Sequence, residues 1–138
     1  MKLAIGTGNF NKKFFLKGET LNNNNKKNLI RLFNDSCNTF IDTSPEYGNA
    51  EYIIGNNTNN NSKIIKKISK LKKIRKNITQ RILKNISYSL QKLNKKSVYG
   101  ILLHSSTDFL NNKTEFIKAL ALLKIRNLTK KTGISIYN

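Results

Sequence analysis

The sequence is poor in the residues that mark several protein classes. Its 138 residues include no tryptophan, one cysteine, one proline and one methionine. The single Cys37 excludes an internal disulfide and offers no spacing for a metal site. No apolar run reaches the roughly 18 residues that a membrane span needs, and residues 1–6 lack the pattern of a signal peptide. The simplest interpretation is a soluble, cytoplasmic protein with no membrane partner.

Acidic residues are also scarce, with 7 Asp and Glu against 26 Lys and Arg, which gives a net charge of +19. Such a charge suggests binding to nucleic acid or another polyanion. However, most of it comes from lysines spread along the chain among many asparagines, and isoleucine and leucine interrupt the densest basic run, residues 63–76. Bases are recognised by arginine forks and aromatic platforms, and neither clusters here. We therefore expect no specific nucleic-acid partner.

Apolar segments of two kinds alternate along a chain that suits one domain, residues 1–138. Short apolar runs indicate buried strands at residues 3–8, 39–42, 63–68, 98–104 and 133–138. Helical spacing indicates helices from about residue 20 to 33, at 51–55, at 78–93 and at 114–125. We expect Gly55 to end the second helix and Asn77 to cap the third. Strands that alternate with helices predict an α/β fold with a parallel sheet.

Two α/β architectures fit this alternation, a doubly wound sheet and a (β/α)8 barrel. A doubly wound nucleotide-binding fold has a glycine-rich phosphate loop after its first strand, but residues 6–11 lack the third glycine of that loop. In a barrel, functional side chains collect at the carboxyl ends of several strands. The predicted strand ends supply small or polar residues throughout: Gly6, Thr7, Asp42, Lys67, His104 and Ser135. This favours an incomplete (β/α)8 TIM-barrel type with about five parallel strands.

The segment from residue 41 to 51, Ile-Asp-Thr-Ser-Pro-Glu-Tyr-Gly-Asn-Ala-Glu, suggests a site. A strand that ends on Asp42 needs a cation nearby, because an unpaired carboxylate at a core edge costs several kcal/mol. Tyr47 follows five positions later, and a phenol becomes a useful proton donor when a cation lowers its pKa. Alternatively, Asp42 could cap the next helix and Tyr47 could pack over the strand ends.

Taken in order, these segments resemble the aldo-keto reductases over nearly the whole chain. Residues 3–7 resemble the family's first strand, and residues 40–51 with Ile54 and Gly55 resemble its signature after the second strand. Residues 63–68 are similar to the strand that carries its lysine, residues 99–104 to the strand that carries its histidine, and residues 130–138 to its fifth strand. The resemblance implies NADPH-dependent reduction of an aldehyde or ketone, sugar-type carbonyls included.

The resemblance also implies site residues. The catalytic set would be Asp42, Tyr47, Lys67 and His104, with no metal. Tyr47 would protonate the carbonyl oxygen, Lys67 would lower the phenol pKa, Asp42 would hold Lys67, and a neutral His104 would donate a hydrogen bond to the carbonyl. Lys66 is the alternative to Lys67, since neighbouring side chains alternate along a strand, and the family's pattern favours Lys67.

For the cofactor, the resemblance implies contacts to the nicotinamide side from Gly6, Thr7, Asp42 and Ser135. A full barrel has eight strands and about 250 residues, so this chain would be the amino-terminal portion of one. Its open sheet would have two bare edges. A truncated gene is the favoured explanation, and a split enzyme completed by a partner chain or self-pairing are the alternatives. A second function therefore stays open: an inactive remnant, or an interaction module that uses the sheet edge.

Overall fold

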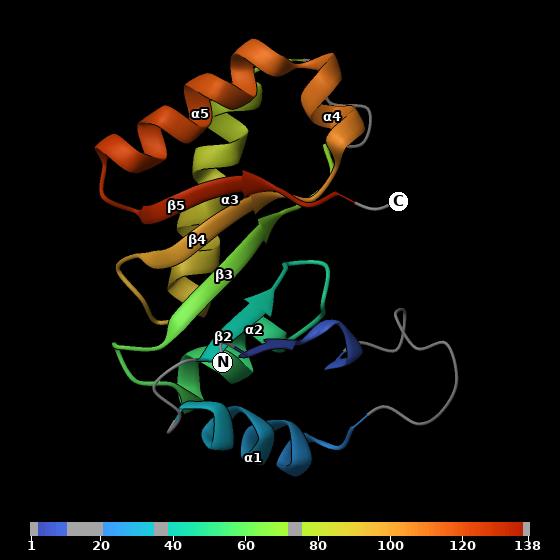
Figure 1. Ribbon diagram of the computed structural model, residues 1–138, viewed down its shortest axis with the longest axis vertical. Helices are drawn as coiled ribbons and strands as arrows, with labels where there is room; N and C mark the ends of the chain where they lie inside the picture. Colours follow the sequence, from blue (N-terminus) through green and yellow to red (C-terminus); the bar gives the residue numbers. More distant parts are fainter. Residues whose placement is uncertain (1–2, 11–20, 35–38, 72–75, 137–138) are drawn as a thin grey trace.

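The computed structural model describes residues 3–10, 21–34, 39–71 and 76–136. In these residues one parallel sheet has the strand order β1-β2-β3-β4-β5 (Figure 1). A doubly wound sheet reverses its strand order at a switch point, whereas here the spatial order follows the sequence. The predicted incomplete barrel-type α/β fold is confirmed. The strands are β1 (Leu3–Gly6), β2 (Thr39–Thr43), β3 (Lys63–Ile68), β4 (Val98–Leu103) and β5 (Thr129–Ile134).

Helices connect the successive strands. In Figure 1, α2 and α3 lie behind the strands, α1 lies below β1 and β2, and α5 lies above β5. None of the helices that can be described is long and apolar enough to cross a membrane. A short 3-10 helix, η1 (Gly8–Phe10), follows β1. The α-helices are α1 (Asn23–Asn34), α2 (Ala50–Asn57), α3 (Ile78–Lys92), α4 (Ser106–Asn111) and α5 (Lys113–Ile125).

Helix α3 has the apolar face that its sequence spacing predicts. Ile78, Ile82, Ile86, Leu90 and the C-cap Leu93 are all buried. The helix packs on β3 and α5. Each such side chain contributes about 1.5–3 kcal/mol when fully buried, so this face is a large part of the core that supports β3 and β4.

The amino end of α3 is not capped as expected. Asn77 occupies the N-cap position, but its backbone is left-handed with φ 55° and its side chain makes no capping hydrogen bond. Instead, the carboxylate of Glu115 on α5 accepts hydrogen bonds from the Thr79 backbone N–H at 3.3 Å and from the Thr79 hydroxyl at 2.7 Å. A side chain 36 positions away thus satisfies one of the first N–H groups of the helix.

Gly55 does not end α2 but lies inside it. A Cβ at this position would come within 2.4 Å of the Lys92 carbonyl oxygen and 2.7 Å of the Leu93 carbonyl carbon. The residue therefore allows α2 to approach the carboxyl end of α3. The helix ends after Asn57, where the Asn57 amide donates to the Ile53 carbonyl at 2.8 Å.

The fifth strand begins at Thr129, four residues before the predicted start at Gly133. Asn127 adopts a left-handed φ of 54°, and the Leu128 N–H donates to the Leu123 carbonyl at 2.9 Å, so α5 passes directly into β5. Lys130 is exposed on this edge strand, and lysine on edge strands opposes unwanted pairing. Because polar residues such as Lys130 interrupt the apolar pattern, the start of this strand cannot be recognised from apolar residues alone.

Other features differ from what the sequence predicts or cannot be compared with it. Helix α1 begins at Asn23, with the Asn22 side chain accepting from the Asn25 N–H at 2.8 Å, while the predicted start near residue 20 lies outside the described residues. Helix α4 was not predicted. Cys37 and the last two residues of the predicted fifth strand also lie outside the described residues.

A buried ion pair joins the sheet to its helical layer. Lys66 on β3 is fully buried, and its Nζ lies 3.9 Å from Oε1 of Glu51 on α2. The same Nζ donates to the Lys67 carbonyl at 3.2 Å. Burial lowers the pKa of Lys66 to about 8, and the Glu51 charge only partly opposes this effect. Lys66 thus costs stability while it is charged.

We expect Gly55→Ala to lower the free energy of unfolding by about 2–3 kcal/mol, because the new methyl group overlaps backbone atoms that cannot rotate away. Urea denaturation at neutral pH measures the effect. Gly100→Ala is the matched control, since its Cβ would meet Ile65 Cγ1 at an ordinary 3.6 Å. Equal stability of the two variants would contradict the packing assigned to Gly55.

We expect the free energy of unfolding to rise with pH between about 8, the pKa of Lys66 in the folded chain, and 10.5, the ordinary pKa of a lysine. Between these values the unfolded chain binds more protons at Lys66 than the folded chain does. Urea titrations across this range should show a weaker rise for Lys66→Met/Glu51→Gln. Lys84→Met, on an exposed lysine, is the control. A rise unchanged in the double variant would refute the burial of a titrating Lys66.

Candidate active site

The carboxyl ends of the parallel strands gather the predicted site residues at one edge of the sheet. Gly6 is paired with Asp42 across β1 and β2. The backbone N–H and the hydroxyl of Thr7 both donate to the Asp42 carbonyl, at 3.0 and 2.9 Å. His104 follows β4 directly, and the Ser135 N–H after β5 donates to the Leu103 carbonyl at 2.8 Å. Main-chain hydrogen bonds alone therefore hold the ends of neighbouring strands, and the site residues on them, next to one another.

Asp42 and Lys67 form the ion pair at the centre of this edge. Lys67 Nζ lies 2.8 Å from Asp42 Oδ2, and both side chains retain some exposure. Burial by itself lowers the pKa of Lys67, but the hydrogen bond and charge of Asp42, with a further contribution from Tyr47, outweigh burial and raise it. The ammonium group therefore stays charged at neutral pH. The alternative Lys66 points to the helical layer and is not part of this site.

Tyr47 is held with its hydroxyl next to the Lys67 cation. Lys67 Nζ donates to the Tyr47 hydroxyl at 3.3 Å and lies 5.8 Å from the ring centroid. The tyrosine is only 6% exposed. A turn fixes its backbone, because the Tyr47 N–H donates to the Ser44 carbonyl at 3.0 Å, and Gly48 follows with a left-handed φ of 66°. The turn therefore holds the buried tyrosine at this site.

His104 also lies beside Tyr47 in this cluster. Its ring meets the Tyr47 ring edge-on, with centroids 6.4 Å apart and an interplanar angle of 81°. The residue is buried. Burial lowers the pKa of His104, the charge of Glu46 opposes this, and the Lys67 and Lys70 cations lower it further. The ring is therefore mainly neutral at pH 7. The four residues predicted as a set lie together.

Glu46, which the sequence pattern does not single out, also belongs to this cluster. Its Oε2 lies 3.7 Å from His104 Nδ1, and its Oε1 accepts from the Lys70 N–H at 3.1 Å. Its place next to Tyr47 was the only available indication, since the contact with His104 spans more than fifty residues of sequence. The alternative that Asp42 caps the next helix does not hold, because α2 begins at Ala50 with Asn49 at its N-cap position.

The residues at the end of β1 could accommodate a flat cofactor ring. A Cβ on Gly6 would meet no atom within 4 Å, so open space lies beside Asp42. Thr7 is fully buried with its hydroxyl bound to the Asp42 carbonyl, and it therefore holds the strand end in place. Ser135 is partly exposed next to the His104 strand. Within the described residues, no three His, Cys, Asp or Glu side chains lie close enough to hold a metal ion.

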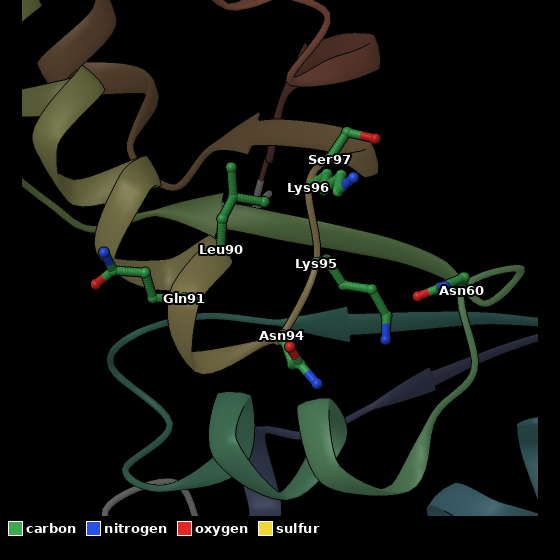
Figure 2. Close-up of a pocket in the computed structure, with 7 residues that line it drawn as sticks. All are labelled: Asn60, Leu90, Gln91, Asn94, Lys95, Lys96 and Ser97. Atoms are coloured by element: carbon green, nitrogen blue, oxygen red, sulfur yellow. The ribbon is translucent and has the colours of Figure 1, made fainter.

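A pocket at the opposite end of the sheet is a different kind of feature. Figure 2 shows it between the end of α3 and the start of β4, and Lys95 extends there to donate to the Thr58 carbonyl at 3.2 Å. The pocket precedes β4 whereas His104 follows it, and six strand residues span about 20 Å. Since the amino end of barrel strands serves stability, we assign this pocket no catalytic role. Its lining residues are Asn60, Leu90, Gln91, Asn94, Lys95, Lys96 and Ser97.

A parallel sheet in sequential order, with helices connecting its strands, is the arrangement found in β/α-barrel proteins. A family model narrows this class, because the model of the aldo/keto reductase family matches residues 2–138. The chain belongs to the aldo/keto reductase family. A comparison with curated proteins finds no match.

Solved structures support the same fold. A protein from Pseudomonas aeruginosa classed as an aldo-keto reductase is 24% identical with a TM-score of 0.76, over 96% of this chain and 54% of its own. The glycerol dehydrogenase of Gluconobacter oxydans is 20% identical with a TM-score of 0.69, over 98% and 44%. An aldo-keto reductase from Bacillus halodurans is 16% identical with a TM-score of 0.75, over 97% and 45%. The chain thus spans about half the length of these proteins.

We expect the Asp42–Lys67 pair to couple by about 1–2 kcal/mol in a double-mutant cycle built from Asp42→Asn and Lys67→Met, because each single change leaves a partly buried group without its partner. Urea unfolding of the four proteins at pH 7 provides the cycle. Additive effects, with no coupling beyond about 0.3 kcal/mol, would show that the two groups do not depend on each other.

Proposed function

We propose that this chain carries the catalytic residues of an aldo-keto reductase that reduces an aldehyde or ketone with NADPH. One observation supports this most directly. The Tyr47 hydroxyl lies 3.3 Å from an ammonium group that Asp42 holds at 2.8 Å, and the His104 ring lies against the tyrosine. A buried phenol beside a fixed cation is suited to donate a proton. Membership of the family supports the same chemistry.

When bound, NADPH supplies the hydride that reduces the carbonyl carbon. Tyr47 then protonates the carbonyl oxygen, which gains negative charge during the reaction. The Lys67 ammonium group stabilises the phenolate that remains on Tyr47, because opposite charges a few ångströms apart attract strongly in a partly buried site. Asp42 keeps the ammonium group in place and balances its charge. Gly6 would leave room for the nicotinamide side of the cofactor beside Asp42, the buried Thr7 would hold the end of β1 in place there, and Ser135 would contact the nicotinamide amide.

His104 would orient the substrate. Its place beside Tyr47 suits a hydrogen bond to the carbonyl oxygen, which fixes that oxygen near the proton donor. A neutral imidazole has one N–H and one acceptor nitrogen. The groups around the ring therefore decide whether the nitrogen that meets the substrate can donate.

The five strands described here would not complete such a site. The chain spans 54% of the Pseudomonas aeruginosa protein, and a full barrel has eight strands, so strands beyond the fifth would close the barrel and add cofactor contacts. We propose that activity requires these strands, which could come from a partner chain. Within the described residues, β1 and β5 are the outermost strands of the sheet, and this favours a second candidate function, a non-catalytic module that pairs through these strands.

For the leading function, we expect Tyr47→Phe to bind NADPH as the unchanged chain does but to lose at least about 100-fold in turnover, since general acid catalysis is worth that much or more. Fluorescence titration measures binding, and NADPH consumption with simple aldehydes measures turnover. Both are run with the chain alone and with the carboxyl-terminal half of the Pseudomonas aeruginosa relative. Tyr88→Phe, on an exposed tyrosine of α3, is the control.

Absence of both binding and turnover in the wild-type chain, with and without the added half, would contradict the proposed reduction. Light scattering across a concentration series separates the second candidate. Association without NADPH binding would favour the interaction module, and a compact monomer that binds NADPH would exclude it.

A further inference from the structure

We propose that Glu46 is a positioning residue that selects which nitrogen of the His104 ring carries the proton. The carboxylate oxygen Oε2 of Glu46 lies 3.7 Å from Nδ1 of His104, which suits an ion pair when the ring is protonated and is longer than a hydrogen bond, so the carboxylate acts on the neutral ring through its charge. A carboxylate can only accept hydrogen bonds. It therefore favours the form of the ring that has its N–H on Nδ1 and disfavours the form that presents a lone pair there.

Local contacts hold Glu46 in this position. Its second carboxylate oxygen, Oε1, accepts from the Lys70 backbone N–H at 3.1 Å, which ties the loop after β2 to the loop after β3. Its own N–H lies 3.3 Å from the Ser44 hydroxyl oxygen, within the turn that also fixes Tyr47. While Oε1 accepts the Lys70 hydrogen bond, Oε2 lies near the imidazole. The Glu46 side chain is 31% exposed and that of His104 is 7% exposed.

The other charged groups around the ring act on its total charge. Lys67 on β3 and Lys70 in the following loop oppose a positive ring, while Glu46 and Asp42 favour one. Tyr47 contacts the ring edge-on and is not charged in its donor form. Burial and the two lysines thus keep the ring mainly neutral at pH 7. In that neutral ring the proton is on Nδ1, next to Glu46, and Nε2 is an acceptor.

The consequence for catalysis rests on the proposed reductase function. A carbonyl oxygen needs a donor, and the neutral ring described above has none at Nε2. His104 would donate from Nε2 only after it gains a second proton, with Glu46 as the counter-charge. Turnover would then rise as the pH falls through the His104 pKa, and the neutral donor expected from the sequence would apply only without Glu46.

The test uses the fact that the chain contains one histidine. Long-range proton–nitrogen NMR spectra of the full 138-residue chain, labelled with nitrogen-15, report both ring nitrogens of His104 without ambiguity. In the wild-type chain above the His104 pKa, we expect Nδ1 to be the protonated nitrogen. In Glu46→Gln, we expect the Nε2–H form to gain population and the His104 pKa to fall by about 0.5–1 unit, as expected for a partly exposed pair near 4 Å.

Glu115→Gln is the matched control, because it removes a carboxylate that binds Thr79 on α3. It should change neither the protonated nitrogen nor the pKa of His104. A wild-type ring protonated on Nε2 would overturn the proposal, as would a Glu46→Gln chain with an unchanged pKa. The wild-type spectrum is decisive even if the variant does not fold.

These spectra need neither NADPH nor a carbonyl compound. If they agree with the proposal but the completed barrel shows no turnover, the Glu46 assignment stands and the reductase function fails. If turnover is present, Glu46→Gln should show a weaker rise in kcat toward low pH than Glu115→Gln. An equal rise in both would overturn the catalytic role of Glu46.

Discussion

The ion pair between Asp42 and Lys67 is the interaction on which the site depends. It joins the carboxyl ends of β2 and β3 at 2.8 Å and keeps the ammonium group charged beside the Tyr47 hydroxyl. Without Asp42, a partly buried cation would lose its partner, and Tyr47 would lose a fixed neighbour. The same carboxyl-end geometry brings His104 next to the tyrosine and Glu46 next to His104. The Asp42–Lys67 pair thus both stabilises the carboxyl ends of β2 and β3 and places a cation beside the Tyr47 hydroxyl.

Two adjacent lysines on β3 show how a strand separates structure from chemistry. Lys67 faces the charged cluster, while Lys66 faces the helices and pairs with Glu51. Since side chains alternate along a strand, one residue step changes the environment completely. Burial lowers the pKa of Lys66 to about 8, whereas Asp42 raises that of Lys67 despite burial. The charge of one lysine serves the site, and that of the other is a cost to the fold.

Much of this architecture could be predicted because it is local. The five alternating strands, the apolar face of α3 and the bounds of β3 follow from spacing alone. The errors have non-local causes. Gly55 looked like a helix end, but it makes room for the backbone at Lys92. Asn77 looked like a cap, but Glu115 supplies the cap from another helix. Lysines on the exposed edge concealed the start of β5.

The sequence by itself determined the alternation of strands and helices and the polar residue at each strand end, because hydrophobic periodicity and residue type are properties of short segments. Resemblance to a family added the choice of Lys67. Only the tertiary structure decided which groups touch. It paired Asp42 with Lys67, turned Lys66 away, and placed Glu46 against His104. Distances between side chains far apart in the chain depend on strand register and on the packing of helices against the sheet, which no single segment encodes.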